Sequence, residues 1–189
     1  MFHLDEPLAK PDQGLLEHLR QVATLGKEIA RRLELSPNLR KRALLACWLH
    51  DVGKALRSFQ EYIRAVQALE QARTEGAPES KFRELERAVW SKKARSFPHA
   101  LAALAPTLLI EKELFGRPFL ATAAVLSHHS PLNESLYAHH ERPPSDPENL
   151  IRFLESLFPI LIKAGFAIPR ESLREIKQFL RLSPAGLLY

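Results

Sequence analysis

The sequence predicts an all-α fold, and three observations lead to that prediction. Apolar residues recur every three or four positions over long stretches, as on one face of a helix. No stretch alternates apolar and polar residues over the length of a useful strand. Two expected helix starts, Ser36-Pro37 and Asp146-Pro147, have a capping residue followed by proline. With 189 residues and 46% hydrophobic content, we expect one helical domain over residues 1–189.

The N-terminal half is expected to form a tail that ends near Pro11-Asp12, followed by helices. The first helix should span residues 13–34, and His18 falls on its apolar face and so should point into the core. A buried histidine bonded to a carbonyl group is the alternative role for this residue. The next three helices are expected over residues 36–50, 55–76 and about 80–93.

A helical segment with a lone histidine follows Ser96-Phe97-Pro98. His99 precedes several alanines, and Pro106 marks a kink or a boundary in this segment. An almost wholly apolar run then begins at Pro118 and ends in His128-His129. Because such a helix has no polar face, we expect it at the centre of the fold.

The C-terminal part begins with the longest irregular connection. Residues 130–149 are rich in Pro, Asn, Ser, Glu and His, and they form a candidate lid. Its histidines, His139 and His140, are expected to be exposed, because nothing anchors the segment. Further helices are expected over about 148–163 and from Pro169 to about Leu182.

Composition limits the compartment and the partners. A single cysteine excludes an internal disulfide framework and suits a reducing cytoplasm. No run approaches ~18 apolar residues and no signal peptide is evident, so we expect a cytoplasmic protein without a membrane span. The net charge of +5 suits a polyanionic partner. The candidate nucleic-acid contacts, for which a solvated helix end is the alternative, are Trp90, Lys92, Lys93 and Arg95.

The stretch from His50 to Lys54 carries the most distinctive chemistry. His50 and Asp51 together offer a nitrogen ligand and an oxygen ligand that can bridge to a second ion. Gly53 is expected to take the φ values that end a helix. Lys54 then lies one turn on, where it can meet a phosphate oxygen. Taken alone, the same residues would suit an ordinary helix C-terminus with a solvated lysine.

Four further histidines favour a metal site, because each lies in or beside an apolar run. Helical bundles build metal sites from such side chains on different helices. The nitrogen-rich set suits one or two ions of Mn, Fe, Co, Ni or Zn better than Mg²⁺ or Ca²⁺. The candidate ligands are His18, His50, Asp51, His99, His128 and His129.

The number of candidate ligands exceeds what one tetrahedral ion needs. Two ions about 3.5–4 Å apart would clamp the attacking and leaving oxygens of a phosphoryl displacement. No P-loop, dinucleotide fingerprint or paired serine or cysteine nucleophile is evident. Phosphodiester hydrolysis, with Asp51 and Lys54 as the catalytic residues, is therefore the reaction that these residues favour.

The order of these motifs resembles the HD phosphohydrolase superfamily. Its details are similar to the HD nuclease domain of the CRISPR-associated type I interference helicase-nuclease: Phe59-Gln60 follows the His50–Lys54 motif, and the lone His99 precedes the run Val125–His129. A signalling relative that cleaves cyclic dinucleotides carries Gly-Tyr-Pro after its paired histidines. This chain has Ser130-Pro131-Leu132 there, which counts against that branch.

The resemblance implies a metal-dependent nuclease that cleaves single-stranded DNA in CRISPR interference. Such a nuclease works beside or fused to a helicase module and is recruited to an RNA-guided surveillance complex. The alternatives are an HD phosphohydrolase acting on nucleotides and a catalytically weakened helical scaffold subunit. In the metal sites that the resemblance implies, Lys54 faces the scissile phosphate, one ion lies between His18, His50 and Asp51, and a second lies between Asp51, His99, His128 and His129.

The resemblance also implies one further ligand, an aspartate on a late helix. Asp146 is the only aspartate after His129, and it lies in a proline-rich segment that does not match. The chain reaches Tyr189 without a counterpart, so the C-terminal helix with this ligand is expected to be missing. We therefore expect the first metal site to be the weaker one.

Overall fold

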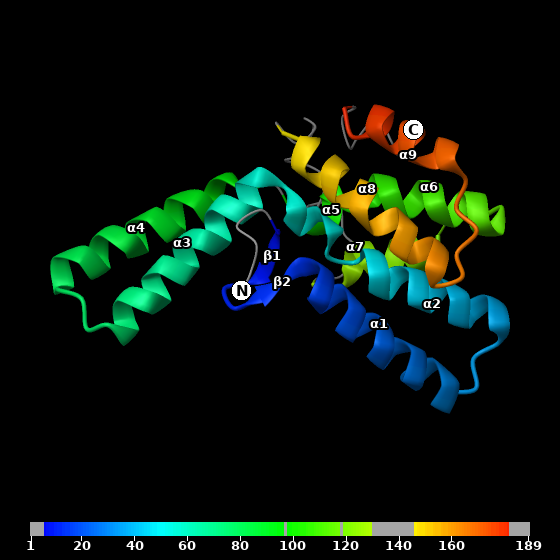
Figure 1. Ribbon diagram of the computed structural model, residues 1–189, viewed down its shortest axis with the longest axis horizontal. Coiled ribbons are helices and arrows are strands. Elements are labelled where there is room, and N and C mark those ends of the chain that lie inside the picture. Colours follow the sequence, from blue (N-terminus) through cyan, green and yellow to red (C-terminus); the bar gives the residue numbers. More distant parts are fainter. Residues whose placement is uncertain (1–5, 97, 118, 130–145, 182–189) are drawn as a thin grey trace.

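The computed structural model describes residues 6–96, 98–117, 119–129 and 146–181 (Figure 1). Within these residues the chain is helical apart from one short hairpin, which confirms the predicted fold class. The elements in chain order are β1 (Leu8–Lys10), β2 (Gln13–Gly14), α1 (Leu15–Arg32), α2 (Pro37–Leu49), the 3₁₀ helix η1 (Val52–Ala55), α3 (Arg57–Thr74), α4 (Glu79–Arg95), α5 (His99–Ala102), α6 (Leu104–Phe115), α7 (Leu120–Ser127), α8 (Glu148–Lys163) and α9 (Arg170–Phe179).

The described part of the expected N-terminal tail contains strand β1, which pairs with β2 just before α1. The two strands pair antiparallel, with Leu8 opposite Gly14. The side chain of Gln60 on α3 holds Leu8 at both backbone groups, because its Oε1 accepts from Leu8 N at 2.9 Å and its Nε2 donates to Leu8 O at 2.9 Å. The sequence analysis expected a tail up to Pro11-Asp12 and did not predict this pairing, since a hairpin this short leaves no alternating pattern.

A single main core joins helices from both ends of the chain. Four side chains of α8 are fully buried at helical spacing, and they pack with residues of α1, α2, α6 and α7. These four residues are Leu150, Leu154, Leu157 and Leu161, and the buried face of α8 also includes Ile151, Phe153 and Phe158. Val125 on α7 is also fully buried, so the apolar helix that ends in the paired histidines lies against the core, as predicted.

Several predicted helix boundaries require correction. Ser36 caps α2 by accepting a hydrogen bond from Leu39 N at 3.4 Å, as predicted. Pro106 does not mark the break, because it lies in the first turn of α6 and the break falls at Ala103. Asp146 does not cap α8, since Pro147 occupies the N-cap without a side-chain hydrogen bond. The candidate lid, with His139 and His140, lies almost wholly outside the described residues.

Helices α3 and α4 form a hairpin that projects from the body (Figure 1). The two helices pack along each other, and none of the α4 side chains that the structure describes is buried. Among the described helices, none combines the length and the apolar character needed to cross a membrane.

Candidate metal centre

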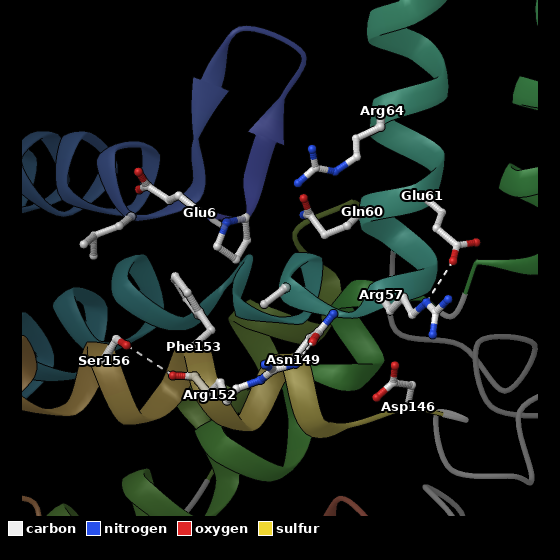
Figure 2. A pocket seen from close by; sticks show the side chains of 13 residues that line it. Glu6, Arg57, Gln60, Glu61, Arg64, Asp146, Asn149, Arg152, Phe153 and Ser156 are labelled. Carbon is white, nitrogen blue, oxygen red and sulfur yellow. Dashed lines mark hydrogen bonds and ion pairs between the residues drawn. The ribbon is translucent and has the colours of Figure 1, made fainter. Parts of the chain in front are cut away.

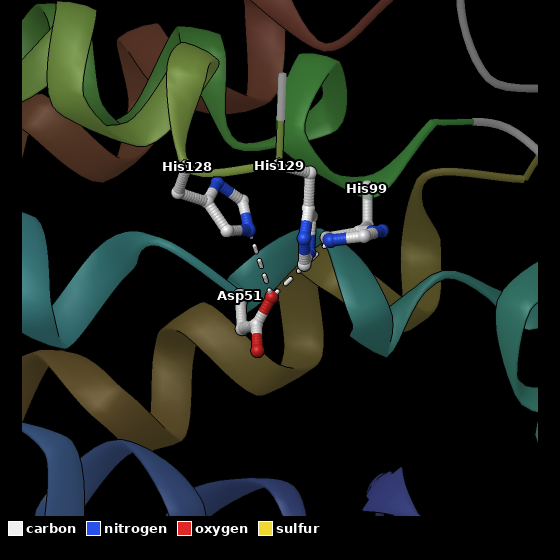
Figure 3. Close-up of side chains that lie close together, drawn as sticks. All are labelled: Asp51, His99, His128 and His129. Carbon is white, nitrogen blue, oxygen red and sulfur yellow. Dashed lines mark ion pairs between the residues drawn. The ribbon is translucent and has the colours of Figure 1, made fainter.

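The candidate ligands come from four separate places in the fold and meet around Asp51. His18 projects from α1, and His50 directly follows α2. His99 begins α5, and the paired histidines directly follow α7. Figure 3 shows His99, His128 and His129 converging on the Asp51 carboxylate. The ligand atoms form two groups, each within 4.8 Å: Asp51 with His99, His128 and His129, and Asp51 with His18 and His50.

The two carboxylate oxygens of Asp51 face different groups of histidines. Oδ2 lies 3.0 Å from His18 Nε2 and 3.2 Å from His50 Nε2. Oδ1 lies 3.3 Å from Nε2 of both His99 and His128. Asp51 is only 3% exposed. A buried carboxylate between two sets of imidazoles is the arrangement that a shared ligand of two cations requires.

Three buried polar atoms at this centre have no hydrogen-bond partner within the described part of the chain. They are Asp51 Oδ1, His99 Nε2 and His128 Nε2. Their separations are short, but the atoms are not aligned as hydrogen bonds. Leaving a buried polar atom unsatisfied costs about 1–3 kcal/mol. A cation between them would satisfy all three atoms at once, so the residues present fit a metal ion.

Backbone bonds turn two of the imidazoles toward the centre. His50 Nδ1 donates to Cys47 O at 2.9 Å, and His128 Nδ1 donates to Val125 O at 2.5 Å. A carbonyl oxygen only accepts, so Nδ1 carries the proton in both rings and Nε2 keeps its lone pair. Metal-binding histidines are commonly oriented by such bonds.

The surroundings of these side chains favour the protonation states that bind a metal ion, neutral imidazoles and an ionised carboxylate. Burial lowers the pKa of His18, His99 and His129 below the usual 6.5, so these imidazoles stay neutral near pH 7. Burial alone would raise the pKa of Asp51, but the neighbouring rings of His128, His50 and His99 reverse that effect. The net direction is a pKa far below the usual range of a carboxyl, so Asp51 is ionised.

The prediction that Gly53 ends a helix through its φ angle was wrong. Gly53 lies inside η1 and does not adopt a positive φ. A Cβ atom at this position would overlap the carbonyl oxygen of His99 and the side chain of Ala102. The glycine is therefore needed for the close approach of α5, which brings His99 to Asp51.

Lys54 lies at the centre, where its ammonium group contacts the Asp51 carboxylate. Its Nζ is 2.8 Å from Asp51 Oδ2 and donates to Ala9 O at 3.5 Å. Gln60 Nε2 donates to Lys54 O at 2.7 Å, and the Phe59 ring lies 5.7 Å from Lys54 Nζ. Phe59-Gln60 entered the sequence analysis only as a mark of resemblance. The hydrogen bonds from the Gln60 side chain to the backbone of Leu8 and of Lys54 leave no recognisable pattern in the sequence.

The candidate nucleic-acid residues lie near the C-terminal end of α4, on the projecting hairpin. Trp90 is 69% exposed, and Lys93 Nζ lies 5.5 Å from its ring. Lys92 is half-buried, and the side chain of Arg95 is outside the described part of the structure. The structure brings Trp90 and Lys93 together on the last turns before the segment that leads to His99.

A separate pocket of about 850 Å³ lies between α3, α8 and the residues before β1 (Figure 2). It is lined by Arg57, Arg64 and Arg152, but also by Glu6, Glu61 and Asp146. These opposite charges balance, so the pocket offers no net attraction to a polyanion. Asp146 belongs to this lining and to neither ligand group at the metal centre.

A helical fold with an adjacent His-Asp pair, of which Asp51 is buried, and further histidines on other helices defines an HD-type metal site. The family model described as "Cas3, HD domain" matches residues 12–181, and the chain belongs to this family. Its members are CRISPR-associated, metal-dependent hydrolases of the HD superfamily that act on nucleic acid in interference complexes. Searches among curated proteins and among solved structures found no match to this chain.

Proposed function

We propose that residues 1–189 form one HD nuclease domain that cleaves single-stranded DNA in CRISPR interference. The observation that carries this proposal is the Asp51 carboxylate, whose two oxygens each face a separate pair of imidazole nitrogens. We further propose that the domain acts in the cytoplasm beside a helicase module and an RNA-guided surveillance complex.

In this proposal the two ligand groups hold two ions of Mn, Fe, Co, Ni or Zn. His18, His50 and Asp51 would hold the first, while Asp51, His99, His128 and His129 would hold the second. Bound ions would supply Lewis-acid stabilisation of the phosphate charge and lower the pKa of water. The shorter ligand list of the first group supports unequal affinities, with the first ion bound more weakly.

Other features of the chain would bind the substrate and orient the metal ligands. Lys54 presents its ammonium at 2.8 Å from Asp51 Oδ2, where it can attract a phosphodiester to the centre. The backbone bonds of His50 and His128 hold their rings in the orientation that binding requires. The exposed ring of Trp90 with Lys93 beside it offers a stacking surface and a positive charge to single-stranded DNA.

The test is cleavage and metal binding by the purified chain. With Mn²⁺, Co²⁺ or Ni²⁺ we expect metal-dependent cleavage of single-stranded DNA that exceeds cleavage of duplex DNA, with one or two ions bound per chain. Turnover of mononucleotides without DNA cleavage would instead identify a nucleotide phosphohydrolase. Absence of metal binding under excess ion would leave the scaffold interpretation.

A further inference from the structure

Glu111 is a fully buried carboxylate that the metal centre itself does not use. It lies on α6 with 0% exposure. Burial by itself raises the pKa of Glu111, but hydrogen bonds from the chain outweigh burial and lower it. The side chain is therefore ionised in the protein interior, and its charge requires compensating partners.

The first partners of Glu111 lie at the N-terminal end of α7. Oε2 accepts from Phe119 N and Thr122 N, both at 2.9 Å, and from Thr122 Oγ1 at 2.8 Å. Oε1 accepts from Ala121 N at 2.9 Å. The first amides of a helix have no partner within the helix, and a negative charge there is favourable. Glu111 thus caps α7 from a different helix.

The remaining partner of Glu111 comes from α2. Arg42 Nη1 donates to Glu111 Oε1 at 2.6 Å and to Arg117 O at 3.0 Å. The Arg42–Glu111 ion pair is largely shielded from solvent, with 12% of the Arg42 side chain and 0% of the Glu111 side chain exposed. Helices α2 and α7 are the two whose C-terminal ends lead directly into His50-Asp51 and His128-His129. Through Glu111, the ion pair therefore links α2 to the start of α7, the two helices that end at these candidate ligands.

The backbone at the start of α7 is held in an unusual conformation. Phe119 has a φ of 149°, which a residue with a Cβ adopts only when its surroundings hold it there. Its ring is exposed, so packing of the ring does not explain this conformation. The hydrogen bond from its amide to Glu111 does.

We propose that Glu111 is a positioning residue for the metal centre: held by Arg42, it fixes the start of α7 and thereby places His128 and His129 at the other end. Eight residues of helix span about 12 Å, so a tilt of about 10° at the start moves the far end by about 2 Å. Metal–ligand distances tolerate only about 0.2 Å. The inference rests on the proposed metal site and names the residues that shape its second ligand group.

Two variants test this role. Glu111→Gln removes the charge and places an amide N–H against the donors of α7, while Thr122→Val removes one donor with little change in shape. For Glu111→Gln we expect the second ion, measured by Co²⁺ titration against a His128→Ala reference, to bind about 10–100-fold more weakly. For Thr122→Val we expect a loss of about threefold. The first ion should change by less than either loss.

A readout without metal keeps this inference separate from the proposed function. In the metal-free chain, the ring signals of His128 and His129 in NMR spectra should shift or broaden in both variants, whereas those of His18 should not. If the wild-type chain binds no metal, the proposed function fails, and these spectra still decide the positioning role. If Glu111→Gln does not fold, Thr122→Val decides it.

The control is Leu161→Ala, a core change on α8 at a fully buried position. It should lower the free energy of unfolding and leave both the histidine signals and the second-site affinity at wild-type values. The inference is overturned if folded Glu111→Gln and Thr122→Val keep wild-type histidine signals and affinity. Equal losses in Leu161→Ala would also overturn it, because they would show a general effect of stability.

Discussion

Asp51 is the residue on which the whole centre depends. Its carboxylate lies near four imidazoles and the Lys54 ammonium. The pKa values of Asp51, His18 and His99 are all lowered, so the carboxylate is ionised while these two imidazoles are neutral. A single oxygen-donor residue thus faces both ligand groups. Among the residues that the structure describes, no other belongs to both groups.

Replacing Asp51 by asparagine should abolish hydrolysis more completely than replacing any one histidine. The amide keeps the size of the side chain but removes the charge that both ions need, so we expect nuclease activity to fall by at least about 100-fold. The matched control is Asp146→Asn, because that carboxylate lines the separate pocket and contacts neither ligand group. Cleavage assays at equal protein and metal concentrations would decide, and activity near wild type in Asp51→Asn would exclude the two-ion scheme.

At the level of single residues, the sequence allowed the candidate ligands to be singled out, but not the Glu111–Arg42 pair that we propose positions two of them. Histidines beside apolar runs can be recognised from the chain alone, and the structure brings all of those singled out to Asp51. Glu111 and Arg42 lie 69 residues apart, and no local pattern links them. The only hint in the sequence was that Glu111 lies within a mostly apolar helix. An exposed glutamate on such a helix would give the same pattern.

At the level of elements, helix existence followed from periodicity, while the breaks depended on tertiary contacts. Proline chemistry suggested a boundary at Pro106, but a proline in a first turn starts a helix without strain, and the chain bends at Ala103 instead. The bend turns α5 toward η1, where Gly53 admits the backbone of His99. Such a close approach cannot be predicted from a glycine alone.

Gly53→Ala tests that approach of α5 to η1. The added methyl would overlap the His99 carbonyl, so α5 must move, and we expect a loss of about 1–3 kcal/mol in the free energy of unfolding together with the loss of the second ion. Gly26→Ala is the control, since its added methyl meets the Cys47 side chain on α2 and not a backbone atom. Denaturant unfolding and metal titration of both variants would separate the effects. Retention of both ions in Gly53→Ala would contradict this role for the glycine.

At the level of the whole molecule, the metal centre lies in the helical body and the α3–α4 hairpin projects away from it (Figure 1). The hairpin contributes little to the main core, since its cluster of buried residues is a separate one around Phe59 and Ile63. A long helix with no buried side chain among those described costs conformational entropy and returns little burial. The exposed ring of Trp90, with Lys93 beside it, offers a surface of the kind that the proposed binding of single-stranded DNA requires.

Binding of single-stranded DNA should weaken when the base of this hairpin is made acidic. Each phosphate contact on a single strand contributes about 0.7 to the slope of log affinity against log salt, so Lys92→Glu with Lys93→Glu should reduce that slope by about 1.4. The control is Lys81→Glu with Arg83→Glu, which makes the same charge change on α4 at the end distant from His99, where both side chains form exposed ion pairs. Fluorescence anisotropy over a salt series would measure both slopes. An equal reduction in the two variants would show a general charge effect, and an unchanged slope in Lys92→Glu with Lys93→Glu would mean that Trp90 and its lysines are a solvated helix end.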